Sequence, residues 1–217
     1  MRITNSHIHI NGQTFSVTEH FDGLTNIILK KEVRLLVVGG VDQLHSPDDG
    51  ITPSITVWDC MTGKVQKQQT HFRNKLHSFN DNPSSIEFWR NGRVMTKSWH
   101  HHGKRSRLKG PALIKYCRLS DHVFYRGWSL DGRAHRSVPE RPAWIYYCTD
   151  SDVVARVRWT RTSRRDGVLE MLFNKDEELV DFSFTDPRFA RDLLLEWDSR
   201  TMSEVVEAFK IDDDEHD

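Results

Sequence analysis

Short runs of alternating apolar and polar residues recur along the chain, and turn-forming residues separate them. Near the N-terminus, histidine alternates with isoleucine over 7–10, and Asn11-Gly12 then separates this run from a second one at 14–17. Alternation with a period of two is typical of a half-buried strand, and Asn-Gly favours the type I′ turn of a hairpin. The sequence therefore predicts an N-terminal β-hairpin, followed by strands at 27–29 and 33–38.

A weak internal repeat of about 30 residues runs through the middle of the chain, and a proline marks each copy. These prolines are separated by 30, 28 and 31 residues: Pro53, Pro83, Pro111 and Pro142. An aromatic residue stands five positions after each proline: Trp58, Phe88, Tyr116 and Tyr147. In the last three copies, an isoleucine stands three positions after the proline: Ile86, Ile114 and Ile145. A tryptophan follows 16 or 17 positions after the proline in the same copies: Trp99, Trp128 and Trp159. Odd offsets share one face of a strand, so each copy is predicted to form two strands joined by a turn.

After the last repeat proline, the pattern predicts first two further strands and then helices. Over 153–160, alternation predicts a strand with one apolar face and one partly basic face, namely Val153, Ala155, Val157 and Trp159 against Val154, Arg156, Arg158 and Thr160. Asp166-Gly167 then leads into an apolar run at 168–173. Asp186-Pro187 is a favourable helix start, and 201–204 reads as a capping box. The fold class predicted is mainly β (α+β): one or more antiparallel sheets built from hairpin repeats, with C-terminal helices. The predicted organisation is a single domain over 1–210, with repeats at 53–165, helices at 186–210 and a disordered acidic tail at 211–217.

The composition is that of a folded, polar chain. Of 217 residues, 37% are hydrophobic and 22 are aromatic, which argues against disorder. The chain contains no apolar run of the roughly 18 residues that a membrane crossing needs, and its N-terminus lacks the apolar region of a signal peptide. Three widely spaced cysteines form no CxxC pair, which fits a reducing compartment. A soluble, cytoplasmic protein is expected.

The net charge of zero conceals a strong asymmetry along the chain. Residues 1–85 contain 8 cations and 8 anions, residues 86–165 contain 18 and 6, and residues 166–217 contain 5 and 17. The central segment thus carries a net +12 and the C-terminal segment a net −12. A basic surface attracts polyanions, and arginine forks suit phosphate groups. The candidate nucleic-acid-binding residues are Lys97, Lys104, Arg105, Arg107, Lys109, Lys115, Arg118, Arg126, Arg133, Arg136, Arg156, Arg158, Arg161, Arg164 and Arg165.

Several features allow a second interpretation. The regular spacing of Trp99, Trp128 and Trp159 favours a place in the core over base stacking. The acidic end is either a solubilising tail or a competitor for the basic segment. Alternation would place His7 beside His9 and His100 beside His102, but neither pair has a third ligand in sequence, so no metal site is predicted. Nucleotide-binding and hydrolase motifs are absent, so we predict a protein that is not an enzyme and has no cofactor.

The segment from Trp99 to Tyr147 resembles the MORN-like Gly-Pro-Ala variant repeats of bacteriophage and large DNA virus proteins. The matching residues are Trp99, Gly103, Arg107, Gly110, Pro111, Ala112, Ile114 and Tyr116 in one copy, and Trp128, Gly132, His135, Arg136, Pro142, Ala143, Ile145 and Tyr147 in the next. In this second copy Arg141 replaces the glycine before proline. The resemblance implies a viral protein whose β-hairpin repeats serve as a binding surface. More loosely, a strand-rich body with a closing helix and a basic face is similar to the whirly-type messenger-binding early proteins of jumbo phages.

The leading hypothesis is a non-enzymatic protein that binds RNA or single-stranded DNA without strong sequence preference, in the cytoplasm of an infected host cell if the protein is viral. The arginines and lysines would hold the backbone, and a minority of aromatic residues would stack on bases. The alternative is a protein–protein interaction module that engages a host protein. No membrane partner is expected, and the sequence leaves open the oligomeric state and the choice between RNA and DNA.

Overall fold

A computed structural model describes residues 1–36, 41–47, 52–134, 142–148, 151, 153–160, 168–176 and 178–184. The chain divides into two compact units, Met1–Lys104 and Arg105–Asp217, and each is described by itself. The described residues are mainly β and contain no helix, which confirms the predicted mainly β class. The helices predicted over 186–210 and the acidic tail at 211–217 lie outside the described residues.

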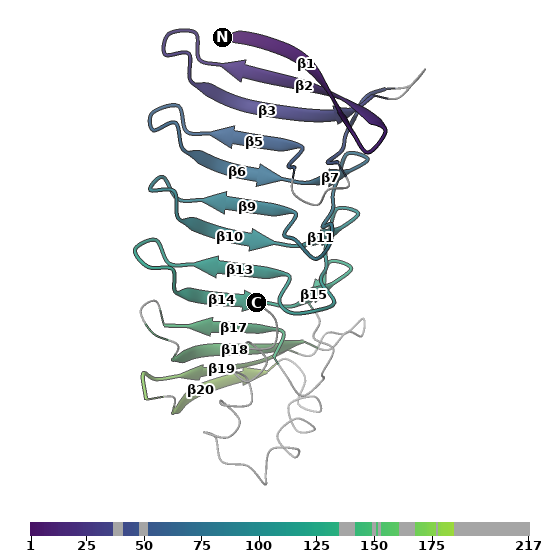
Figure 1. Cartoon of the computed structure of the whole chain (residues 1–217). Coiled ribbons are helices and arrows are strands. Elements are labelled where there is room, and N and C mark those ends of the chain that lie inside the picture. The colour runs from purple at the N-terminus through teal and green to yellow at the C-terminus, as the bar shows by residue number, and fades with distance from the viewer. Residues whose placement is uncertain are drawn as a thin grey trace. The chain divides into compact units, whose positions relative to one another are not determined.

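Unit 1 is built on an antiparallel sheet whose strands follow one another almost in chain order, β1-β2-β3-β5-β6-β9-β10, with β4 beside β3 (Figure 1). Its elements are β1 (Arg2–Ile10), β2 (Gln13–Phe21), β3 (Ile28–Leu35), β4 (Gln43–Leu44), β5 (Ile55–Trp58), β6 (Val65–Gln69), β7 (His71–Phe72), β8 (Lys75–Leu76), β9 (Ser85–Phe88), β10 (Val94–Ser98) and β11 (His100–His101). The short strand β12 (Lys104–Arg105) completes a hairpin with β11, as β8 does with β7.

Unit 2 continues in the same manner, with an antiparallel strand order of β13-β14-β17-β18-β19-β20. Its elements are β13 (Leu113–Tyr116), β14 (Val123–Gly127), β15 (Ser129–Leu130), β16 (Arg133–Ala134), β17 (Trp144–Tyr147), β18 (Val154–Thr160), β19 (Val168–Phe173) and β20 (Leu179–Phe184). The short strands β15 and β16 pair only with each other. Chain-order pairing means that neighbouring long strands are also close together in the sequence.

The predicted N-terminal hairpin is confirmed. Strands β1 and β2 pair antiparallel, with Ile10 opposite Gln13 across the turn. Asn11 and Gly12 have φ angles of 50° and 75°, the positive values that a type I′ turn requires at both central positions. The two strands predicted at 27–29 and 33–38 are instead one strand, β3, and positions 37 and 38 lie outside the described residues. The charged residues between the two predicted strands are accommodated in β3: Lys31 lies opposite Glu19 and is bridged to it at 3.6 Å.

The proline repeat is the framework of both sheets, and the predicted hairpins are confirmed. The first strand of each copy begins two residues after the proline and ends at the aromatic residue five positions after it, in β5, β9, β13 and β17. That aromatic residue pairs with the valine that begins the second strand: Trp58 with Val65, Phe88 with Val94, Tyr116 with Val123 and Tyr147 with Val154. Each pair lies beside a register shift, so every copy bulges at the same place.

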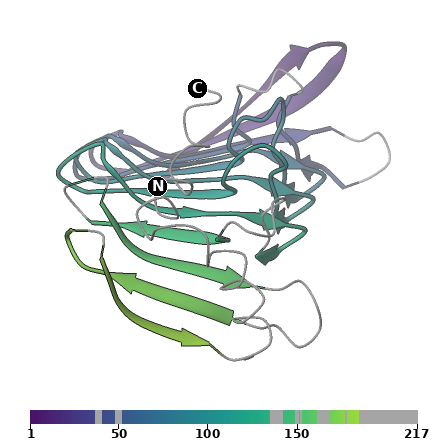
Figure 2. The same ribbon diagram turned by 90° about the horizontal axis from the view of Figure 1, so that it is seen from below.

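A small hairpin follows the second strand in three copies and lies beside the same end of the long strands (Figures 1 and 2). These hairpins are β7–β8, β11–β12 and β15–β16, and their first residues, His71, His100 and Ser129, are spaced by 29 residues. The central turn residues have positive φ: His102 and Gly103 at 49° and 87°, Asp131 and Gly132 at 50° and 80°. These turns are again of the I′ kind.

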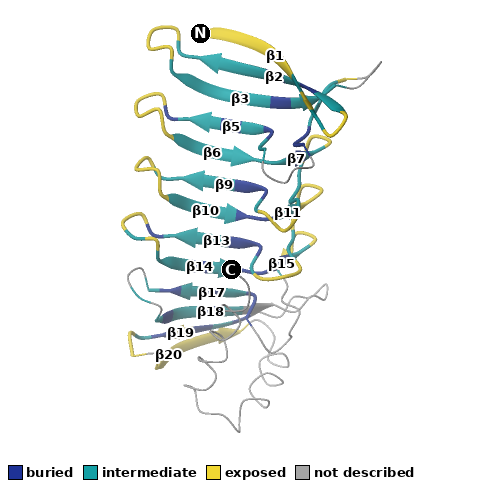
Figure 3. Cartoon of the chain, in the orientation of Figure 1, coloured by how far each residue is buried: buried dark blue, intermediate teal, exposed yellow. Residues whose placement is uncertain are grey.

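Many buried residues of the repeats lie at the ends of the long strands next to the small hairpins, where β5, β9 and β13 are dark blue in Figure 3. The residue after each proline is buried, namely Ser54, Ser84, Ala112 and Ala143, and so are Trp99 and Trp128, with exposed fractions of 4% and 7%. The Trp99 indole Nε1 donates to the Asp81 carbonyl at 2.8 Å. The core interpretation of Trp99 and Trp128 is therefore confirmed, while the side chain of Trp159 lies outside the described residues.

The first and last strands of the described sheets are exposed. Strand β1 is exposed over most of its length, although Ile8 and Ile10 pack against the buried cluster of Phe15, Val17 and Val33. All six residues of β20 are exposed. Within the described ranges, the structure holds no helix with the length and hydrophobicity that a membrane crossing requires.

Candidate nucleic-acid interface

Three of the predicted cationic residues lie on one face of the unit 2 sheet. The strand register places Lys115 of β13 opposite Tyr125 of β14, Tyr125 opposite Tyr146 of β17, and Tyr146 opposite Arg156 of β18. Directly opposed residues point to the same side of a sheet. The result is a row across four strands in the order cation, ring, ring, cation.

A second row runs beside the first on the same face. Gly127 of β14 lies opposite Trp144 of β17, which lies opposite Arg158 of β18. A Cβ atom on Gly127 would come within 2.7 Å of the Tyr125 hydroxyl and 3.0 Å of Trp144 Cδ1, so glycine leaves room for both side chains. We call the six side chains of the two rows the basic aromatic face: Lys115, Tyr125, Trp144, Tyr146, Arg156 and Arg158.

Each cation of the basic aromatic face lies over a ring of the same face. Lys115 Nζ is 5.1 Å from the Tyr125 ring centroid, Arg156 Cζ is 4.4 Å from that of Tyr146, and Arg158 Cζ is 5.1 Å from that of Trp144. The two tyrosine rings meet edge to face, with centroids 4.8 Å apart. Cation–π contacts contribute about 0.5–2 kcal/mol each, depending on desolvation, and they hold the cationic groups in place.

The electrostatics of this face are dominated by its cations. Burial raises the pKa of Tyr125 to about 12, and the neighbouring Tyr146 adds to the shift while Arg105 and Arg158 oppose it. Tyr125 therefore stays protonated as a hydrogen-bond donor at neutral pH. One carboxylate, Glu170 of β19, lies opposite Arg158 and forms an ion pair with Arg156 at 3.4 Å.

Arg158 has unmet hydrogen-bonding capacity. Its Nε atom is buried, and the described part of the chain offers it no hydrogen-bond partner. A buried N–H without an acceptor carries the full cost of its desolvation, about 1–3 kcal/mol. The ring of Trp144 compensates in part through its π face, but it supplies no acceptor oxygen.

The other candidate residues are distributed over different places. Arg126 is on the opposite face of β14, where its Nη1 donates to the Tyr147 hydroxyl at 2.9 Å. Arg107 donates to the Pro111 carbonyl at 3.3 Å and so braces its own loop. Lys97 lies in unit 1, half-buried on β10, and the exposed candidates in turns and short strands are Lys104, Arg105, Lys109, Arg118 and Arg133. Arg136, Arg161, Arg164 and Arg165 lie outside the described residues.

Sequence alternation predicted the arginine face of β18 correctly but misplaced one residue. Val154 was expected to share the face of Arg156 and Arg158. In the structure it lies opposite Tyr147 and is fully buried, because a register shift between Tyr146 and Tyr147 adds one residue to β18. The partnership of the cations with Tyr125, Trp144 and Tyr146 was not predicted. A sequence signal exists for part of it: Lys115 and Tyr146 each stand four positions after a repeat proline, and Tyr125 and Arg156 each stand fourteen positions after it.

The structure also gathers three histidines in unit 1, although the sequence predicted no metal site. His100, the expected neighbour of His102, bonds through Nδ1 to the Ser84 hydroxyl at 2.9 Å. The residues that come together are His77, His101 and His102, whose ligand atoms all lie within 4.8 Å of one another. Alternation fails here because His102 occupies a turn position with positive φ.

These features define a mainly β protein made of stacked antiparallel hairpins, with a basic aromatic face on one unit. Comparison of the chain with protein-family models, with curated proteins and with solved structures gives no significant match.

Proposed function

We propose that the protein is a non-enzymatic binder of RNA or single-stranded DNA, and that the basic aromatic face of unit 2 holds the nucleic-acid backbone. The observation that carries this proposal is the cation–ring–ring–cation row of Lys115, Tyr125, Tyr146 and Arg156. Such a row combines the two parts that sequence-tolerant single-strand binders use, cations for phosphates and aromatic side chains for bases.

The arrangement favours an extended polyanion over a small anion. Neighbouring strands are about 4.8 Å apart, so Lys115 and Arg156, separated by three strand spacings, are roughly 14 Å apart across the sheet. This spacing suits a chain of phosphates that lies across the row better than a single phosphate. Arg158, whose Nε has no hydrogen-bond partner among the described residues, lies beside this path, and its guanidinium offers further donors for phosphate oxygens.

The rings have a mainly supporting role in this proposal. Tyr125 is 7% exposed, and Lys115 lies over its ring, so its surface is not open to a base. Trp144 and Tyr146 are only half-buried, and they become available for stacking when their arginines turn toward phosphates. Backbone contacts therefore supply most of the affinity, which is consistent with binding that does not depend on base sequence.

The test is a titration of fluorescently labelled random RNA and of single-stranded DNA with full-length protein, followed by anisotropy at several salt concentrations. The triple variant K115Q/R156Q/R158Q removes the three charges and keeps side chains of similar reach. The control variant R2Q/R73Q/R90Q removes the same charge from unit 1, where Arg2 and Arg73 also lie over rings, those of Phe21 and Phe72.

We expect the unit 2 variant to weaken binding and to reduce the slope of log K against log salt by about 2, which is 0.7 for each of three phosphate contacts on a single strand. The control variant should keep the wild-type slope. Equal losses of affinity in both variants would show that binding depends on net charge alone and not on the basic aromatic face. An absence of binding by the wild-type chain would exclude the proposal and favour the protein–protein interaction module instead.

A further inference from the structure

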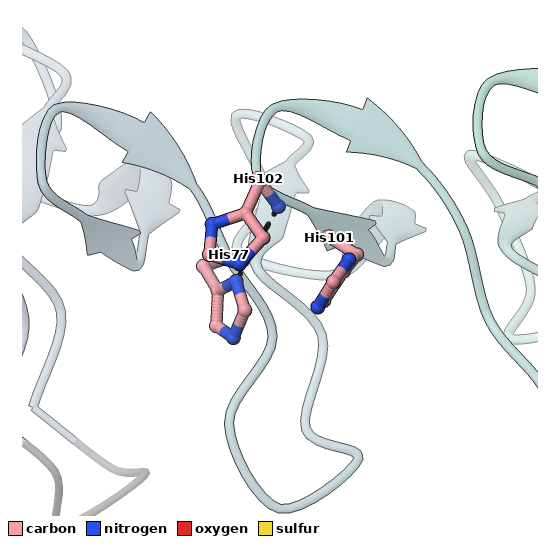
Figure 4. Close-up of side chains that lie close together, drawn as sticks. All are labelled: His77, His101 and His102. Atoms are coloured by element: carbon pink, nitrogen blue, oxygen red, sulfur yellow. Dashed lines mark hydrogen bonds between the residues drawn. The ribbon is translucent and has the colours of Figure 1, made fainter.

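The structure assigns a second site to this chain: we propose that His77, His101 and His102 in unit 1 form a three-histidine site for a divalent transition-metal ion, with Zn²⁺ as the physiological candidate. The three imidazoles converge from two neighbouring segments of the repeat (Figure 4). The site is independent of the basic aromatic face, and its test does not depend on nucleic-acid binding.

Backbone hydrogen bonds between successive copies of the repeat set the positions of the three residues. The Gly103 N–H donates to the Leu76 carbonyl and the Ser78 N–H donates to the His100 carbonyl, both at 2.8 Å. These two bonds enclose His77 on one segment and His101 with His102 on the other. The convergence of the histidines thus follows from the main-chain pairing that joins the two small hairpins.

The turn geometry at His102 brings two consecutive side chains together. Consecutive residues of an extended strand point to opposite faces, which would separate His101 from His102. His102 has a φ of 49° and is followed by Gly103 at 87°, so the chain reverses there. The two rings consequently meet with centroids 4.3 Å apart, and His77 lies 5.1 Å from His101 and 4.7 Å from His102.

The distances suit a site that closes on its metal with small side-chain movements. Tetrahedral coordination with Zn–N bonds of about 2.0–2.1 Å places the ligand nitrogens roughly 3.3 Å apart. The present separations reach up to 4.8 Å. Because His101 and His102 are exposed, rotation of their side chains can close this difference without moving the backbone.

The surroundings of His77 favour its neutral imidazole, the form that binds metal. Burial lowers the pKa of His77, and His102, His101 and His45 lower it further through charge repulsion. Phe72 and Phe79 cover one side of the cluster, with ring centroids 5.5 Å and 5.0 Å from that of His77. Neutral nitrogen ligands on an apolar base suit Zn²⁺, Ni²⁺, Cu²⁺ or Co²⁺, and not Mg²⁺ or Ca²⁺, which prefer oxygen.

One existing contact competes with the metal. The His102 backbone N–H points at His77 Nδ1 over 3.4 Å, which exceeds the usual upper length of such bonds, about 3.2 Å. Its loss on metal binding therefore costs little. Three protein ligands also leave a fourth position for solvent or for a ligand atom from a partner molecule.

The test is calorimetric titration of the metal-free, full-length protein with ZnCl₂ at neutral pH, with Co²⁺ as a spectroscopic probe whose visible absorption reports tetrahedral coordination. Two variants each remove one ligand. H101A acts at an exposed strand position, and H102N places asparagine, a residue suited to positive φ, at the turn, so that the hairpin is retained. H7A is the matched control, because it removes an exposed histidine from β1.

We expect one Zn²⁺ ion per chain to bind with an affinity that falls about tenfold or more in both H101A and H102N, since even the loss of a group that only orients a ligand costs on the order of 10–100-fold. The Co²⁺ absorption should weaken in parallel, and H7A should behave as wild type. Cys60 and the carboxylates of 212–217 are present in all four proteins, so any binding by them cancels. The proposal would be overturned if the four proteins gave the same binding isotherm, if the wild-type chain bound no zinc, or if only H101A lost zinc affinity.

Discussion

The Ser54 hydroxyl lies 2.7 Å from His71 Nδ1, in a buried pair that joins the residue after a repeat proline to the first residue of a small hairpin. The next copy repeats the pair with Ser84 and His100 at 2.9 Å. Both serine hydroxyls also donate to the last carbonyl of the long strand that leads into the small hairpin, that of Gln69 or Ser98. The third copy has Ala112 and Ser129 at these positions. The serine and the histidine are therefore replaced together in the copy that does not form this hydrogen bond.

We predict that His71 makes the fold sensitive to acid. Burial and the nearby charge of Lys67 lower its pKa from 6.5 to about 4. Below pH 6.5 the His71 imidazole is protonated in the unfolded chain but stays neutral in the folded chain. The contribution of neutral His71 to the free energy of unfolding is therefore complete above pH 6.5 and is lost as the pH falls toward 4. The loss amounts to about 3 kcal/mol at most.

Urea unfolding at pH values from 7 to 4 measures this effect. H71Q should be less stable than wild type at pH 7, because the Ser54 pair is lost, but its stability should fall less steeply with acid. Carboxylates and other histidines titrate in both proteins, so only the difference between the two curves reports His71. Parallel curves would show that another group causes the acid sensitivity.

Arg126 and Arg156 should respond differently to loss of charge, although both were candidate binding residues. R156Q removes a cation from the basic aromatic face and should weaken RNA binding. R126Q acts on the opposite face, where it removes the hydrogen bond from the Arg126 guanidinium to the Tyr147 hydroxyl, and should lower the free energy of unfolding by about 1 kcal/mol. Paired anisotropy and denaturation measurements check this. A larger binding loss in R126Q than in R156Q would contradict the assignment of the faces.

The turn at His102 should tolerate asparagine and reject valine. A β-branched side chain at positive φ crowds its own backbone and costs roughly 1–2 kcal/mol. H102N should therefore match the wild-type melting temperature within a few degrees, while H102V should lower it clearly. Scanning calorimetry measures the melting temperatures of H102N and H102V. Equal melting temperatures would mean that the hairpin turn is not formed.

Trp99 should contribute to stability through its volume more than through its hydrogen bond. W99A removes a buried ring and should cost about 3–5 kcal/mol, whereas W99F mainly loses the bond to the Asp81 carbonyl, a loss of roughly 1 kcal/mol. Chemical denaturation of both variants provides the comparison. Similar losses in the two would show that the indole N–H, and not the packing, is the important feature.

Much of the fold could be predicted from the sequence because the hairpin signals are local. Each first strand begins two residues after a repeat proline and ends at the aromatic residue five positions after it, and Asn11-Gly12 forms the turn that its residue types favour. The single strand β3 was not predicted. One of its central charges, Lys31, forms an ion pair with Glu19 of the neighbouring strand, and that information lies outside the segment itself.

The candidate sites were harder to predict because they depend on which side chains share a face. The sequence by itself determined the hairpin repeat, the buried tryptophans and the excess of cations in the centre. Only the tertiary structure decided that Lys115, Arg156 and Arg158 lie together while Arg126 lies opposite, and that His77 joins His101 and His102. The physical reason is that strand alternation is a local rule, whereas a bulge of one residue or a turn with positive φ reverses it, and pairing between distant segments then sets each side chain's neighbours.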